Sequence, residues 1–232
     1  MPDVYLHIGV HKTGTTSVQA YLHDHAHWLL QQHVFVPALS ASVGLQSHFG
    51  LNVYGLDDDR LSPTKLRLLE NPGFDLADYR NHVADAVSNA LQSRGNAPIV
   101  FTNEGLSLLR TKSELARLAA LFNGLSVHVI VYTRDPTAYL RSYEAHLRSY
   151  GYPISDDPAT PFYVAEDSWL RDWDSLVGIY RSQFDSISAL NYDKIVQRDG
   201  DVIPSFLDQL NCSRTGRPPS GGYRHNTTSQ SD

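Results

Sequence analysis

The chain begins with a short apolar run that leads directly into a turn rich in glycine and threonine. Residues 4–8 (VYLHI) have the composition of a buried β-strand, and residues 9–16 (GVHKTGTT) follow at once. Glycines let a backbone curl until several N–H groups converge on one point, and the helix that follows adds partial positive charge there. With the ammonium of Lys12 and three threonine hydroxyls, this turn is suited to binding a nucleotide phosphate.

The turn differs from a Walker A loop, in which the lysine comes directly after the second glycine. Here Lys12 precedes Gly14, so its charge lies at the leading edge of the loop. The helix dipole disfavours a cation at a helix N-terminus, and a lysine at this place therefore indicates an anion nearby.

Strand-like and helix-like segments alternate along the rest of the chain. Further strands are expected at 98–102, 127–132 and 187–192, a short extended segment at 33–36, and helices at 15–32, 75–93, 112–122, after 135, at 168–181 and at 202–210. Alternation of this kind predicts a parallel sheet with crossover helices, whose ligands bind beyond the carboxyl ends of the strands. Residues 1–212 are expected to form one domain, and the polar residues 213–232 a flexible tail. Residues 38–73 are expected to be irregular and to face the substrate.

Composition excludes several classes of partner. The formal net charge of −6 argues against a general binder of nucleic acid or of anionic membranes, which needs a basic excess. No apolar run approaches the length of a membrane span, and we see no signal peptide. Cys212 is the only cysteine, which excludes an intrachain disulfide and fits a reducing compartment; we expect a cytoplasmic protein.

A second predicted junction between a strand and a helix also contains residues suited to binding phosphate. The apolar residues 127–132 run into Arg134 and Pro136, and the helix that follows contains Ser142. Together with residues 9–16, this segment resembles the two phosphate-binding motifs of sulfotransferases that use 3′-phosphoadenosine-5′-phosphosulfate (PAPS). The likeness is closest to bacterial members with a G-x-H-K-T-G-T-T segment. In that family the first motif binds the 5′-phosphosulfate, and an arginine and a serine eight positions later bind the 3′-phosphate.

The resemblance implies a three-layer α/β/α fold with a central parallel sheet, of the P-loop NTPase-like sulfotransferase type. It implies transfer of the sulfuryl group from PAPS to a hydroxyl or amine of a small-molecule or glycan acceptor, without a metal. Lys12 would stabilise the charge that develops on the leaving phosphate. The residues that would bind the co-substrate are His11, Lys12, Thr13, Gly14, Thr15, Thr16, Arg134, Ser142 and, in the C-terminal tail, Arg224.

The catalytic base is expected just after the strand at 98–102. Glu104 occupies the place where related sulfotransferases carry their base, and partial burial would raise its pKa towards a useful range. Alternatively, a glutamate at a helix N-terminus can stabilise the helix through its dipole and take no part in catalysis. His48, in the segment 38–73, is the rival candidate for the base.

Two other functions stay open at this point. A nucleotide kinase or another P-loop phosphotransferase would need Mg²⁺ ligands, whereas the strand at 127–132 leads to Arg134 instead. A non-catalytic nucleotide-binding protein would keep the pocket without a working base. Neither the acceptor nor the oligomeric state can be read from these residues.

Overall fold

A parallel β-sheet forms the centre of the computed structural model, which describes residues 2–223. In this part of the chain the sheet has four strands in the order β2-β1-β3-β4. They are β1 (Val4–His7), β2 (Ile99–Thr102), β3 (Val127–Thr133) and β4 (Ser186–Asn191). Leu6 of β1 pairs with Phe101 on one side and Val129 on the other. The near-continuous apolar sequence of β1 to β3 reflects burial on both faces, as expected of parallel strands.

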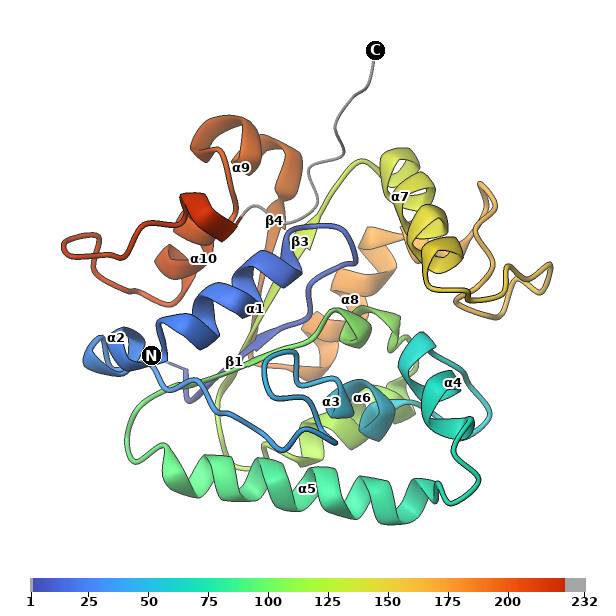
Figure 1. The fold of residues 1–232 in the computed structure, drawn as a ribbon, viewed down its shortest axis with the longest axis horizontal. Helices are drawn as coiled ribbons and strands as arrows, with labels where there is room; N and C mark the ends of the chain where they lie inside the picture. Colours follow the sequence, from blue (N-terminus) through green and yellow to red (C-terminus); the bar gives the residue numbers. More distant parts are fainter. Residues whose placement is uncertain (1, 224–232) are drawn as a thin grey trace.

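Helices cover both faces of the sheet (Figure 1). Alternate residues of each strand pack in opposite layers. Val4, Leu6 and Val129 pack in one apolar cluster with α3, α5, α6, α7 and α8. Tyr5 and Ile130 pack in a second cluster with α1, α2 and α10. The predicted three-layer α/β/α fold is therefore confirmed.

The helices of the described residues have the following bounds: α1 (Thr15–Asp24), α2 (Ala26–Gln31), α3 (Gly50–Gly55), α4 (Pro63–Leu69), α5 (Leu76–Ser93), α6 (Lys112–Ala120), α7 (Pro136–Ser149), α8 (Trp173–Gln183), α9 (Tyr192–Asp199) and α10 (Ile203–Gln209). Three short 3₁₀ helices join them: η1 (Glu104–Leu108), η2 (Trp169–Arg171) and η3 (Gly221–Tyr223). None of these helices is both long and apolar enough to cross a membrane.

Local capping explains where the correctly predicted helices begin. Asp75 accepts a hydrogen bond from the N–H of Asp78 at the start of α5, and Asp135 accepts one from Ala138 at the start of α7. The first helix is shorter than predicted, because the chain leaves the helix at His25 and begins α2 one residue later. Its N-cap is Gly14 in a left-handed conformation, which provides no side-chain hydrogen bond to the helix.

Residues 38–73 contain α3 and α4, where an irregular segment was expected. The glycines at the two ends of α3, Gly50 and Gly55, allow close packing. A Cβ atom at Gly50 would lie 2.7 Å from Val43 Cγ1, and one at Gly55 would lie 2.7 Å from Leu109 Cδ1. Helix α3 therefore packs tightly against its neighbours. The composition of the segment does not predict this packing.

The region after β4 is also more ordered than predicted. Helix α9 had not been expected, and residues 213–223, assigned to a flexible tail, are held against the domain. Arg217 donates hydrogen bonds to Asp208 and to the carbonyls of Pro204 and Cys212. Residues 224–232, which include Arg224, lie outside the described residues.

Candidate functional site

The turn after β1 forms a tight loop at the N-terminus of α1. Lys12 and Gly14 both have left-handed backbone conformations, with φ of +66° and +78°. The hydroxyl of Thr13 donates to the carbonyl of Val10 at 2.6 Å, so this threonine shapes the loop from within. Thr15 is buried, and its hydroxyl has no partner among the described residues, whereas Thr16 is exposed. The loop therefore holds one unsatisfied hydroxyl beside the helix N-terminus, where an anion would be stabilised.

Glycine is required at both ends of this loop for steric reasons. A Cβ atom at Gly9 would lie 2.5 Å from Thr15 Oγ1, which no real side chain tolerates. A Cβ at Gly14 would lie 2.7 Å from Val202 Cγ2, just before α10. The loop is thus closed against the C-terminal part of the domain.

Arg134, at the end of β3, lies directly against this loop. Its Nη1 donates a hydrogen bond of 3.0 Å to the carbonyl oxygen of Lys12, although 122 residues separate the two along the chain. Its guanidinium lies over the ring of Tyr192, 5.4 Å from the centroid, and its Nη2 is 3.9 Å from the carboxylate of Asp193. Arg134 Nε is buried without a partner among the described residues. The fold therefore brings the two sequence motifs together.

Ser142 lies in α7, two turns after Arg134, and its side chain is half-buried. The same helix brings His146 one turn further along. Neighbours four apart share one side of a helix, so Ser142 and His146 lie in one row. We had not predicted His146; this spacing from Ser142 was the signal that could have found it.

Glu104 is the first residue of η1, directly beyond the end of β2. Its Oε1 is 3.9 Å from His11 Nε2, and its side chain is 31% exposed. Burial raises the pKa of Glu104, while the positive charges of His146, when protonated, and Lys12 act in the opposite direction. The carboxylate is therefore partly desolvated and still open to the space in front of it.

Two histidines flank this carboxylate. Burial lowers the pKa of His11 to about 4, with a further contribution from Lys12. Burial and the charge of His11 lower the pKa of His146 to about 4 as well. Their rings are 5.8 Å apart, and the Nδ1 of His11 is buried without a partner among the described residues. Both histidines are therefore neutral at neutral pH.

His48 does not fit the role of a base. It is fully buried, its Nδ1 accepts a hydrogen bond from the N–H of Thr102, and its Nε2 lies 3.1 Å from the carbonyl of Pro37. No ring nitrogen is left for the proton of an acceptor. We conclude that His48 fastens the segment after Val36 to β2, and we withdraw it as a candidate.

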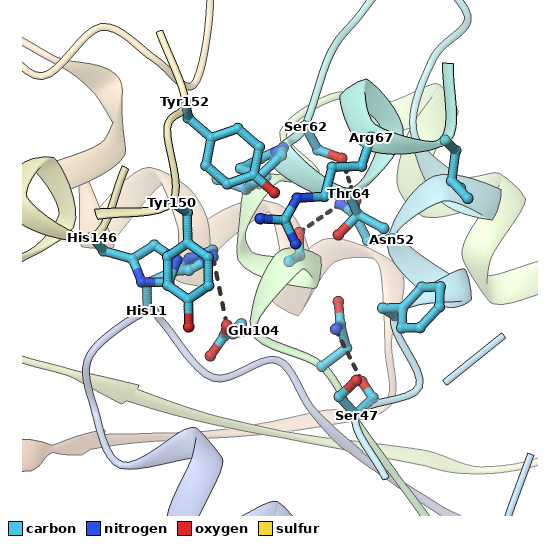
Figure 2. A pocket seen from close by; sticks show the side chains of 16 residues that line it. His11, Ser47, Asn52, Ser62, Thr64, Arg67, Glu104, His146, Tyr150 and Tyr152 are labelled. Carbon is cyan, nitrogen blue, oxygen red and sulfur yellow. Dashed lines mark hydrogen bonds and ion pairs between the residues drawn. The ribbon is translucent and has the colours of Figure 1, made fainter. Parts of the chain in front are cut away.

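A cavity of about 410 Å³ opens in front of Glu104 (Figure 2). Residues of the segment 38–73 form much of its wall, which fits the expectation that this segment faces the substrate. Tyr150 and Tyr152 line the cavity, whereas Tyr139 and Tyr143 are buried in the core. The lining residues are His11, Ser47, Phe49, Asn52, Ser62, Pro63, Thr64, Arg67, Leu68, Asn103, Glu104, Gly105, Leu108, His146, Tyr150 and Tyr152.

The residues around the loop fit a bound phosphate. The unpartnered groups of Thr15 and Arg134 are a donor hydroxyl and a donor guanidinium nitrogen, both buried beside a helix N-terminus. Within residues 2–223, no three His, Cys, Asp or Glu side chains converge as metal ligands.

Comparison with solved structures identifies the fold. The chain is similar to a sulfotransferase from Alicyclobacillus acidocaldarius, with a TM-score of 0.60 and 12% sequence identity, over 95% of this chain and 85% of that one. A sulfotransferase domain from the curacin biosynthetic pathway aligns with 95% of this chain and 76% of its own, at 17% identity and a TM-score of 0.49. No family model and no curated protein sequence matches the chain. The chain therefore has the P-loop-like α/β fold of sulfotransferases.

Proposed function

We propose that this protein is a sulfotransferase that uses PAPS and transfers its sulfuryl group to a hydroxyl or amine of an acceptor. The hydrogen bond from Arg134 to the carbonyl of Lys12 carries the proposal, because it joins the loop after β1 to the end of β3. A ligand with phosphates at both its 5′ and 3′ positions needs two adjacent anion sites of this kind.

The loop after β1 would hold the 5′-phosphosulfate. Lys12 contributes a full charge, and α1 contributes its N-terminal dipole and free N–H groups. Thr15 and Thr16 would add their hydroxyls, while Thr13 and Gly14 keep the backbone in the required shape.

The 3′-phosphate would lie against Arg134 and Ser142, with Arg134 turning from its distant contact with Asp193 to the ligand. A guanidinium binds phosphate oxygens in a forked geometry, which suits it to this task. Arg224, outside the described residues, stays a candidate from the sequence alone.

Glu104 would accept the proton of the acceptor. When bound, PAPS supplies the sulfuryl group, whose transfer forms a bond from sulfur to the acceptor atom and breaks the bond from sulfur to the 5′-phosphate oxygen. Lys12 would stabilise the negative charge left on that oxygen. Its positive charge lowers the pKa of Glu104 and of His11, which supports a place for Lys12 beside the proposed base. His11 would then position Glu104 through their 3.9 Å contact.

The direct test is a calorimetric titration with 3′-phosphoadenosine-5′-phosphate, compared with 5′-AMP and with ATP and Mg²⁺. We expect the bisphosphate to bind at least about tenfold more tightly than 5′-AMP, because a hydrogen bond to a charged group contributes about 1.5–3 kcal/mol. Replacement of Arg134 by alanine (Arg134→Ala) should abolish that preference. Arg181→Ala, which removes an exposed arginine of α8, is the matched control.

Tighter binding of MgATP than of the bisphosphate would contradict the proposal and favour a phosphotransferase. If Arg134→Ala still prefers the bisphosphate to 5′-AMP, the proposal is also contradicted, because Arg134 would then not bind the 3′-phosphate.

A further inference from the structure

The cavity that contains Glu104 also contains an arginine with no acidic partner. Arg67, from α4, is exposed and lines the cavity, and Figure 2 shows its guanidinium reaching into that space. The neighbouring arginines on this side of the domain are paired, Arg60 with Glu114 and Arg80 with Asp58. Among residues 2–223, no carboxylate lies within ion-pair distance of Arg67.

Two tyrosines hold this guanidinium in place. Its central carbon lies 5.0 Å from the ring centroid of Tyr152 and 5.5 Å from that of Tyr150. Both rings belong to the segment after α7, so α4 and that segment meet at the mouth of the cavity. The Tyr152 hydroxyl also accepts a hydrogen bond from this guanidinium, whose other N–H groups can still pair with an anion. These contacts orient the charge without neutralising it.

The cavity wall therefore contains one positive and one negative side chain at neutral pH. His11 and His146 are neutral at neutral pH, since burial lowers the pKa of each to about 4. This leaves Arg67 as the permanent cation among the lining residues and Glu104 as the acidic one. The apolar side chains of the same wall are Phe49, Leu68 and Leu108, with Pro63.

We propose that the acceptor carries an anionic group (a carboxylate, a phosphate ester or a sulfate ester) that Arg67 binds while the acceptor's hydroxyl or amine reaches Glu104. The inference rests on the proposed function, because that function makes this cavity the acceptor site. A guanidinium pairs with all three anions through two parallel N–H···O bonds.

Three pairs of phenols that differ in charge can test this inference. The first is 4-hydroxyphenylacetate against 4-hydroxyphenylacetamide; the others compare 4-hydroxyphenyl phosphate and 4-hydroxyphenyl sulfate with 4-methoxyphenol. Binding is measured by ligand-observed NMR titration, on the protein alone and on the protein saturated with 3′-phosphoadenosine-5′-phosphate. The variants are Arg67→Gln, Arg67→Lys and, as a control, Arg181→Gln, which removes an exposed arginine of α8 away from the cavity.

We expect the anionic member of at least one pair to bind about tenfold or more tightly than its neutral partner, because a hydrogen bond to a charged group contributes about 1.5–3 kcal/mol. The pair that shows this preference identifies the anion. Arg67→Gln should reduce the ratio to within about twofold, Arg67→Lys should retain part of it, and Arg181→Gln should leave it unchanged.

Equal binding within all three pairs, or no detectable binding of any probe, would overturn the inference. So would a preference that survives in Arg67→Gln. Failure to bind 3′-phosphoadenosine-5′-phosphate would overturn the proposed function instead, and the probe ratios from the protein alone would still decide the role of Arg67.

Discussion

Glu104 has surroundings that act on its pKa in opposite directions. Burial disfavours the charged carboxylate and raises the pKa, whereas Lys12 and His146 favour the charged form. Burial is the largest of these effects, so the carboxylate is a better proton acceptor than a solvated glutamate. A glutamate that only capped η1 would need no histidine 3.9 Å from it.

We predict that Glu104→Gln lowers turnover by about 10²- to 10⁴-fold, the usual contribution of a general base. The affinity for 3′-phosphoadenosine-5′-phosphate should stay within about twofold, because the loop after β1 is unchanged. In the wild type, kcat/KM should fall as the pH drops through the raised pKa, and the variant should lose this dependence. The measurement is transfer of radiolabelled sulfuryl groups to an acceptor found by screening with the wild type.

Glu166→Gln, which changes an exposed glutamate before η2, is the matched control and should behave like the wild type. Full turnover in Glu104→Gln would show that another group takes the proton. A wild type that binds the bisphosphate but transfers no sulfuryl group would favour the non-catalytic alternative.

At the scale of elements, the loop between β1 and α1 depends on packing from a distant part of the chain. Gly14 combines a left-handed backbone with a close approach of Val202, and Arg134 holds the carbonyl of Lys12. The geometry of this loop is thus determined jointly by β1, by β3 and by the start of α10.

We predict that Gly14→Ala weakens binding of 3′-phosphoadenosine-5′-phosphate by more than about tenfold and also destabilises the fold. A left-handed conformation costs a residue with a Cβ roughly 1–2 kcal/mol, and the contact with Val202 adds to that cost. Gly95→Ala is a matched control, because Gly95 has φ of +60° and a Cβ atom there would have no neighbour within 4 Å. Calorimetry and urea denaturation measure the two effects.

Gly95→Ala should lose only the stability that the left-handed backbone costs. Its affinity for 3′-phosphoadenosine-5′-phosphate should stay unchanged. Equal losses of stability in the two variants would mean that the loop relaxes freely away from Val202.

At the scale of the whole molecule, three neutral histidines are buried among residues 2–223. Burial lowers the pKa of His7 to about 3 and those of His11 and His48 to about 4. In the unfolded chain each would titrate near 6.5. Between these values the unfolded state binds more protons, so the free energy of unfolding must rise with pH.

We therefore predict that the contribution of these neutral histidines to the free energy of unfolding is complete above pH 6.5. It is lost as the pH falls from 6.5 towards 4. Each histidine contributes a slope of up to about 1.4 kcal/mol per pH unit in that window. Urea denaturation between pH 4.5 and 7.5 measures the slope. His48→Gln should reduce this slope by up to the contribution of one histidine, about 1.4 kcal/mol per pH unit. A free energy of unfolding that stays constant across this range would contradict the prediction.

Much of the fold was predictable because it depends on local patterns. Buried parallel strands are apolar runs, and Asp75 and Asp135 mark helix starts by local hydrogen bonds. The helices α3, α4 and α9 were missed for the opposite reason. They are short, and the glycines of α3 are explained by contacts with Val43 and Leu109, which no local pattern reveals.

The sequence by itself determined the α/β alternation, the two junctions that contain Lys12 and Arg134, and the place of Glu104 after β2, because each depends on neighbours along the chain. Only the tertiary structure decided which of these groups meet. Parallel pairing of β3 beside β1 puts Arg134 on the loop, and the packing of His48 engages both of its ring nitrogens. The contact of α4 with the segment after α7 likewise places Arg67 against two tyrosines, because side chains far apart in sequence share one cavity wall only after the chain has packed.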